Sequence, residues 1–79
     1  MDWQAHIIAT PDTLGGRPRI AGTRIGVEML LDLMASGWSE AQILENYPQL
    51  KPEHLQAVFA FVRDCLRDET FVLRSRAEA

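Results

Sequence analysis

A cluster of helix-breaking residues near the N-terminus sets the strongest limit on what this chain can fold into. Four breakers fall within eight positions: Gly15, Gly16, Pro18 and Gly22. Such a density excludes a helix there. A β-prone run at Ile7–Thr10 precedes the cluster, and Ile20 and Thr23–Ile25 can pair back on it. The sequence therefore predicts a small hairpin or β-arm over residues 1–25.

After residue 25 the apolar spacing becomes helical. Four residues at i, i+3, i+4 and i+7 mark one buried helix face: Val27, Leu30, Leu31 and Met34. Gly37 supplies a C-terminal stop, so a first helix is predicted over residues 26–36. Pro48 ends a second helix, predicted over about residues 40–46.

The second helix has a complete start signal. Ser39 and Gln42 have the spacing of a capping box, and Trp38 and Ile43 that of a hydrophobic staple. A third helix begins at Pro52, where the missing N–H costs nothing. Lys51 is a poor cap for it, because Ser, Thr or Asp would accept a hydrogen bond there.

The third helix is apolar over an unusually wide arc. Its predicted buried stripe consists of Leu55, Val58, Phe59, Val62 and Leu66. Phe61 and Cys65 widen the apolar arc to roughly 160°, more than one core face requires. We therefore expect part of this helix to pack against a partner. The run Phe71–Leu73 near the end of the chain is β-prone and fits a strand, a helix extension or an arm that orders on a partner.

These patterns predict a mainly α fold and one domain overall. The expected parts are a β-arm with a Gly- and Arg-rich turn (1–25), a three-helix unit (26–68) and a C-terminal tail (69–79). A chain of 79 residues has only a marginal core, for which oligomerisation is a common remedy. With Cys65 as its one cysteine, no membrane-spanning run and no secretory signal, the chain is expected in the cytoplasm and not in a membrane.

Charge is unevenly distributed although the net charge is only −3. Three arginines, Arg17, Arg19 and Arg24, stand against two aspartates in residues 1–24. Residues 25–62 carry one lysine against five acids. The chain thus joins a basic N-terminal segment to an acidic body, and any nucleic-acid contact needs that segment.

Catalysis has little support in the sequence. His6 and His54 are the two histidines, and Cys65 on an apolar helix flank is better explained as a packed thiol than as a nucleophile. Glu28 and Asp32 lie one helical turn apart, a spacing that suits a hard cation but fits a solvated face better. We expect no enzyme activity, no metal and no cofactor.

The segment Gly15–Arg19 invites comparison with a phosphate-binding loop. It lacks the Lys-Ser/Thr end of a P-loop and the spacing of a dinucleotide site. Glycines beside arginines can still form an anion-binding turn. A tight hairpin turn with exposed cations is the favoured interpretation.

The second and third helices can form a helix-turn-helix. A DNA reader of that kind would present the start of the third helix, where His54 and Gln56 are the candidate base readers. Glu53 is unfavourable beside phosphates, so the candidate phosphate contacts are Arg17, Arg19 and Arg24. A trihelical fold that serves only protein contacts is the alternative.

Four segments of the chain resemble a known family. The run GGRPRIAGTRI from Gly15 to Ile25 resembles the signature of domain-of-unknown-function family 433. Ala35–Ser39, Tyr47–Pro48 and Leu50–Glu53 are similar to its continuation, with Lys51 in place of the usual Thr or Ser. The resemblance covers about residues 6–66. It implies a homeodomain-like three-helix fold with a β-arm, often dimeric, and a VapB-type antitoxin role beside a PIN-like ribonuclease toxin.

Our first hypothesis is an antitoxin that binds its toxin and, as a second activity, its own operator DNA, as a homodimer. The expected toxin-binding residues are Phe61, Cys65, Phe71, Leu73, Arg74 and Arg76. The tail arginines Arg74 and Arg76 can reach an acidic nuclease site, since guanidinium pairs well with carboxylate, and a solubilising end is an equally good interpretation of them. The alternatives are a stand-alone DNA-binding regulator, a protein-interaction module, and an enzyme acting on a phosphorylated ligand at Gly15–Arg19.

Overall fold

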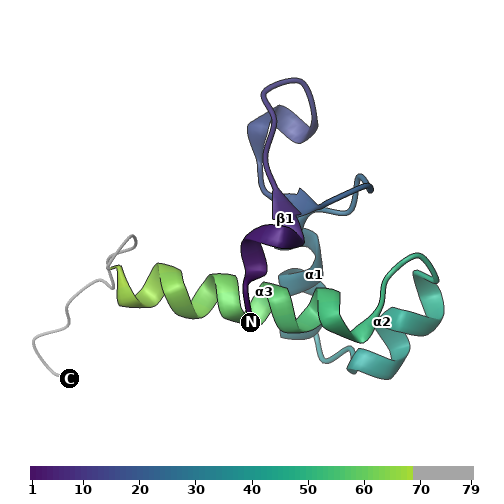
Figure 1. Cartoon of the computed structure of the whole chain (residues 1–79). Coiled ribbons are helices and arrows are strands. Elements are labelled where there is room, and N and C mark those ends of the chain that lie inside the picture. The colour runs from purple at the N-terminus through teal and green to yellow at the C-terminus, as the bar shows by residue number, and fades with distance from the viewer. Residues whose placement is uncertain (69–79) are drawn as a thin grey trace, which may run out of the picture.

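The computed structural model describes residues 1–68. Three helices follow an N-terminal arm: α1 (Val27–Ala35), α2 (Glu40–Asn46) and α3 (Pro52–Arg67). The tip of the arm projects from the helices, while α3 runs across the molecule beneath it (Figure 1). The mainly α class, the three helices and the N-terminal hairpin predicted from the sequence are confirmed.

The arm is a two-stranded antiparallel hairpin, and a short 3-10 turn precedes each strand. The turn η1 (Trp3–Ala5) leads into β1 (Ile7–Ile8), and η2 (Leu14–Gly16) leads into β2 (Arg19–Ile20). Ile7 pairs with Ile20, and Ile8 pairs with Arg19. An additional bridge from Arg19 to Gly26 joins the hairpin to the start of α1.

The far end of the arm contains three consecutive residues in the left-handed region. Their φ angles are +52° at Leu14, +63° at Gly15 and +82° at Gly16. The Gly16 N–H donates to the Thr13 carbonyl, and the Arg17 N–H donates to the Leu14 carbonyl. Glycine enters this region without a Cβ clash, whereas Leu14 has to tolerate it. The breaker cluster thus makes a tight left-handed turn.

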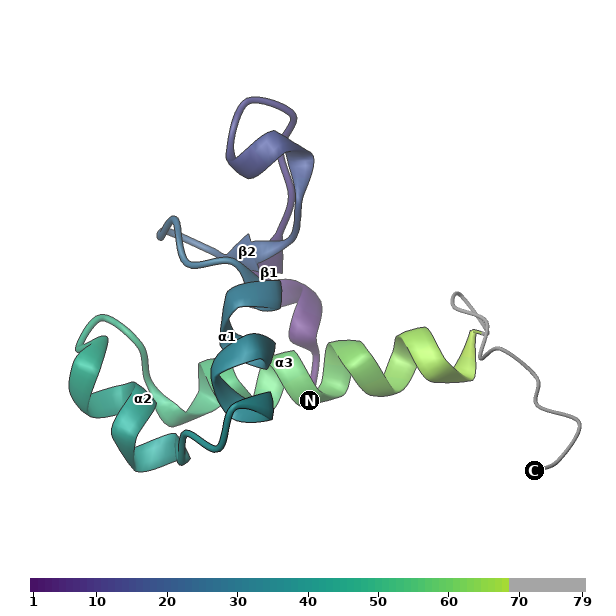
Figure 2. The same ribbon diagram turned by 180° about the vertical axis from the view of Figure 1, so that it is seen from behind.

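The core lies where the base of the arm meets all three helices. Its largest fully buried side chains are Ile20, Leu30, Ile43, Leu55 and Val58. Ile7 and Ile25 from the arm are also buried in this cluster. Because strand residues of the arm are part of the helical core, the arm and the helices form one packed unit. Figure 2 shows α1 and α2 gathered around the N-terminal half of α3.

The helix boundaries follow the local signals in the sequence. The Trp38 N–H donates to the Leu33 carbonyl and the Gly37 N–H to the Met34 carbonyl, so α1 ends in a Schellman motif. At the start of α2, the Ser39 Oγ accepts from the Gln42 N–H at 3.1 Å, and the Gln42 Oε1 accepts from the Ser39 N–H at 2.8 Å. The predicted capping box is confirmed.

The predicted buried stripe of α3 is wrong at two positions. Phe59 and Leu66 are each 50% exposed, although Leu55 and Val58 from the same stripe are fully buried. Ala57 and Ala60 are buried instead, on the side of the helix that faces the body. The periodicity marked an apolar stripe correctly, but Phe59 and Leu66 lie on the edge of the stripe that points away from buried Ala57 and Val58.

Candidate binding surfaces

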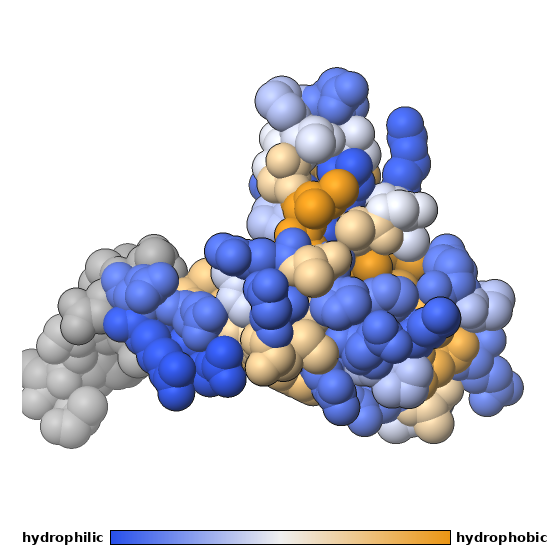
Figure 3. Space-filling model, in the orientation of Figure 1, coloured by the Kyte–Doolittle hydropathy of each residue, from blue (hydrophilic) through white to orange (hydrophobic). Residues whose placement is uncertain are grey.

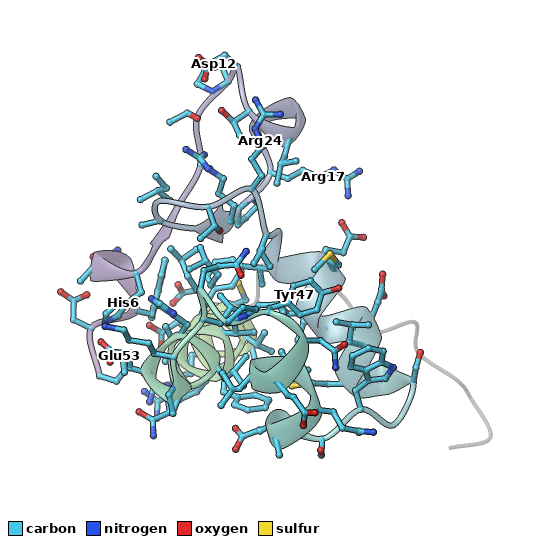
Figure 4. All side chains as sticks on the ribbon, turned by 90° about the vertical axis from the view of Figure 1, so that its right-hand side faces the viewer. His6, Asp12, Arg17, Arg24, Tyr47 and Glu53 are labelled. Carbon is cyan, nitrogen blue, oxygen red and sulfur yellow. The ribbon has the colours of Figure 1, made fainter. Side chains whose placement is uncertain are left out.

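The three arm arginines have different surroundings. Arg17 forms an ion pair with Glu28 of α1, and both side chains are 68% exposed. Exposed pairs of this kind contribute little stability. Arg24 is exposed on the loop after β2. Figure 4 shows Arg17 and Arg24 on the arm, above the helices.

Arg19 is a structural crosslink within the arm. Its Nε donates to the Thr23 carbonyl and its Nη1 to the Thr10 Oγ1, both at 3.0 Å. The side chain is half-buried. The structure therefore uses Arg19 to tie the two sides of the hairpin together, and Arg17 and Arg24 are the exposed cations among the three predicted nucleic-acid contacts.

His54 caps the start of α3. Its Nδ1 accepts a hydrogen bond from the Lys51 N–H at 2.9 Å. This imidazole does what a Glu or Gln at the same position does in a capping box, so it compensates for the poor cap at Lys51. The predicted base reader His54 is thus engaged in the fold, while Gln56 is exposed on the first turns of α3.

His6 and His54 lie edge to face with their ring centroids 5.6 Å apart. Burial lowers the pKa of the His54 imidazole below its ordinary value of 6.5, and the nearby His6 and Lys51 lower it further, while Glu53 acts in the opposite direction. Figure 4 shows His6 and Glu53 near each other, where η1 meets α3. This contact joins the N-terminal turn to α3.

The N-terminal turn also covers one of the predicted partner-binding residues. The rings of Trp3 and Phe61 pack edge to face, with centroids 4.8 Å apart. The Trp3 Nε1 donates to the Asp64 Oδ2 at 2.7 Å. Phe61, expected to face a partner, is therefore half-buried under η1, and Cys65 beside it is also half-buried. Phe71, Leu73, Arg74 and Arg76 lie outside the described residues.

The apolar surface of α3 lies instead at Phe59 and Leu66. Periodicity had assigned both to the core. The length of α3, 16 residues against nine in α1 and seven in α2, is the signal that could have found Leu66, and no sequence signal marks Phe59. Figure 1 shows the C-terminal half of α3 extending past α1 and α2. In Figure 3, hydrophobic side chains gather at the base of the arm, and hydrophilic ones cover the C-terminal end of α3.

Residues 1–68 contain neither a pocket nor a group of three or more His, Cys, Asp or Glu side chains able to hold a metal ion. Over the same residues, all helices are too short or too polar to cross a membrane. The candidate sites on the described part of the chain are therefore surfaces: the arm arginines and the open side of α3.

Comparison with known proteins decides the family. The family model "Protein of unknown function (DUF433)" matches residues 7–62. This protein belongs to the DUF433 family. Its match runs from β1 into the second half of α3, so the family pattern includes both the hairpin and the helical core.

A solved structure supports the assignment. The crystal structure of a DUF433 member from Anabaena variabilis ATCC 29413 is 34% identical, with a TM-score of 0.75. The match covers 82% of this DUF433 chain and 64% of that chain. This chain thus spans less than two thirds of its structural neighbour. No curated protein matches it.

Proposed function

We propose that this DUF433 protein is a non-catalytic binding module of the antitoxin type, which neutralises a PIN-like ribonuclease by covering it. One observation carries the proposal: α3 extends past the body, and Phe59 at its middle and Leu66 in its last turn are each 50% exposed. Large apolar side chains grouped on a surface are characteristic of protein-binding sites. Because the C-terminal half of α3 extends past α1 and α2, this surface is accessible to another protein.

In this proposal α3 has two roles. Its open side is a protein contact, and its C-terminal end connects directly to residues 69–79, which include Phe71, Leu73, Arg74 and Arg76. Arginine is well suited to a nuclease site, because its planar guanidinium pairs with carboxylates through two parallel hydrogen bonds. In this proposal the open side of α3 covers the ribonuclease, and Arg74 or Arg76 reaches its acidic site.

Co-expression tests the proposal. The protein is produced with the product of the neighbouring nuclease-like gene, and copurification and loss of RNA cleavage are measured. We expect a stable complex that is lost when Arg74 and Arg76 are both replaced by Glu. Arg24→Glu, on the far side of the fold, is the matched control and should leave the complex intact. Failure of the unmodified pair to associate would overturn the proposal.

A second candidate activity is operator binding through the arm. The observation that favours it is the exposure of Arg17 and Arg24 on the projecting arm. Binding should depend steeply on salt, and Arg17→Ala with Arg24→Ala should reduce the salt slope by roughly two. Arg67→Ala, an exposed cation at the C-terminal end of α3, is the control. Salt-insensitive binding, or binding unchanged by the arm substitutions, would exclude this activity.

A further inference from the structure

The short loop that carries Arg24 is held by hydrogen bonds on both sides of this residue. The Arg19 Nε donates at 3.0 Å to the Thr23 carbonyl, which belongs to the peptide unit before Arg24. The Ile25 N–H, in the peptide unit after Arg24, donates to the Thr23 Oγ1, also at 3.0 Å. Because both neighbouring peptide units are held, the φ and ψ angles of Arg24 are held as well. We call residues 21–24 the Arg24 loop.

The Arg24 loop is also closed at its base by buried residues. The Ile20 N–H donates to the Ile25 carbonyl at 2.9 Å. The Thr23 N–H and the Thr23 hydroxyl both donate to the Ile20 carbonyl, at 3.0 and 2.8 Å. Ile20 is 0% and Ile25 is 7% exposed, so the loop starts and ends in the core. The fold therefore sets the direction in which the Arg24 side chain leaves the backbone.

The side chain of Arg24 contrasts with this fixed backbone. Arg24 is exposed, and within residues 1–68 its guanidinium makes neither a hydrogen bond nor an ion pair. Arg17 instead pairs with Glu28, and Arg19 is bonded inside the arm. Figures 1 and 2 both show the loop that follows β2 protruding from the side of the arm. A fixed backbone reduces the entropy lost on binding, so this arrangement suits contact with an external anion.

The composition of the Arg24 loop favours a phosphate group over a protein surface. Besides Arg24 the loop consists of Ala21, Gly22 and Thr23, so it lacks the large apolar side chains found at the centre of protein interfaces. A guanidinium pairs with a phosphate through two parallel hydrogen bonds and needs no apolar neighbours for that contact. Phosphate contacts of this kind fix the position of a protein on a DNA duplex.

The charge of the arm fits a polyanion even after the nearby acids are counted. Residues 7–26 contain three arginines and one acid, Asp12. Glu28 of α1 offsets Arg17, which leaves one positive charge in excess. Figure 4 shows Asp12 at the outer end of the arm and Arg24 between it and the helices. Asp12 opposes a DNA contact, so Asp12→Asn should strengthen it.

We propose that Arg24 contacts a backbone phosphate of DNA and that Arg19 is its positioning residue, acting through Thr10 and Thr23. The Arg19 Nη1 donates to the Thr10 Oγ1 at 3.0 Å, which fixes the same guanidinium group whose Nε holds the Thr23 carbonyl. Loss of the Thr10 acceptor therefore loosens the peptide unit before Arg24 without changing any charge. The inference rests on the operator-binding activity proposed above, and it separates the arginine that touches DNA from the arginine that orients it.

Fluorescence anisotropy over a series of KCl concentrations tests the contact, with a DNA duplex covering the region upstream of the protein's own gene as the probe. Arg24→Ala should lower the salt slope by about one, because one phosphate contact is lost. Thr10→Val should weaken binding by about two- to tenfold, the value of one hydrogen bond. Its salt slope should equal that of the wild-type protein, because every cation remains.

Two further threonine variants control this comparison. Thr10→Ser restores the acceptor for Arg19 and should bind DNA as the wild-type protein does. Thr13→Val removes a hydroxyl of the same arm that donates to Asp12 at 3.4 Å, and it should also leave binding unchanged. Circular dichroism of each variant verifies that the helices are intact under the assay conditions.

Hydrogen exchange of the free protein reports on the Arg24 loop directly. Thr10→Val should speed exchange of the Ile25 N–H, whose acceptor is the Thr23 hydroxyl, and Thr13→Val should not. A merely structural role of Thr10 would lower the urea midpoint but leave the DNA affinity of the folded protein unchanged.

An unchanged salt slope in Arg24→Ala overturns the inference, as does full DNA affinity in Thr10→Val. Loss of ribonuclease capture in Arg24→Glu, with DNA binding intact, also overturns it and makes the partner an acidic protein surface. These outcomes are separable from those of the proposed function. A protein that binds the duplex independently of Arg24 contradicts only the inference. A protein that binds no duplex contradicts operator binding itself, and with it this contact, while ribonuclease capture tests the antitoxin role separately.

Discussion

Trp3 and Asp64, 61 residues apart in the sequence, are joined by a 2.7 Å hydrogen bond from the indole Nε1 to the carboxylate Oδ2. The bond fastens the N-terminal turn η1 to the second half of α3, and the Trp3 ring covers Phe61 at the same place. It also lowers the pKa of the Asp64 carboxyl. The first residues of the chain thus complete the surface of its last helix.

Removing the Trp3 ring should therefore destabilise the fold. We expect Trp3→Ala to cost about 2 kcal/mol in urea unfolding, mostly through lost apolar contact with Phe61. Trp3→Phe keeps a ring against Phe61 but loses the hydrogen bond to Asp64, so its effect should be smaller. Equal stability of the wild-type protein and Trp3→Ala would show that η1 does not hold α3.

Stability should fall under mildly acidic conditions because of His54. A lowered pKa in the folded state means that folding disfavours the protonated ring. The stability that neutral His54 contributes is fully present above the ordinary pKa of 6.5. It is lost as the pH falls through the lower pKa of His54 in the folded protein. Protonation also removes the Nδ1 acceptor used by the Lys51 N–H.

Urea midpoints at pH 7.5 and pH 5.0 measure this effect. His54→Gln keeps an acceptor for the Lys51 N–H and has no titration in this range, so its loss of stability on acidification should be smaller than that of the wild-type protein. A His54→Gln variant with the full acid sensitivity of the wild-type protein would assign the effect to other groups.

Two glycines should respond in opposite directions to the same substitution. Gly26 is the N-cap of α1, with φ −74° and ψ 147° and no side-chain hydrogen bond. An added Cβ there would meet Leu14 Cδ1 at 3.6 Å, an ordinary contact. Gly26→Ser should therefore stabilise the protein by about 0.5 kcal/mol through capping and a less flexible unfolded chain.

Gly16→Ser should instead destabilise by about 1 kcal/mol, because Gly16 has φ +82°. Thermal unfolding of the two variants beside the wild-type protein gives the comparison. Shifts of the same sign would show that backbone conformation does not govern these two positions.

The capping box of α2 should be measurable by a single substitution. Ser39→Ala removes the acceptor for the Gln42 N–H and should cost about 1 kcal/mol. Ser36→Ala is the matched control, because Ser36 follows α1 as its C-cap and its backbone N–H supplies the bonds to α1. An equal loss of stability in Ser36→Ala and Ser39→Ala would contradict the assignment of this stability to the capping box of α2.

The sequence by itself determined the features that depend on a few neighbouring residues. Gly15 and Gly16 specify the left-handed turn, Gly37 the end of α1, and Ser39 with Gln42 the start of α2. Each of these signals acts through the backbone of residues at most five positions away. Their conformational preferences therefore predict the three helices and the hairpin without knowledge of the packing.

Tertiary structure alone decided which apolar side chains of α3 are covered. Phe59 and Phe61 lie two positions apart and so face different sides of α3, and periodicity assigned the wrong one of the two to the buried stripe. Phe61 is half-buried because Trp3 returns to it from the other end of the chain. Phe59 is 50% exposed because it faces the open side of α3, although Val58 and Ala60 on either side of it in the sequence are buried. Helical periodicity assigns residues to the sides of a helix, and the covering of each side depends on elements distant in sequence.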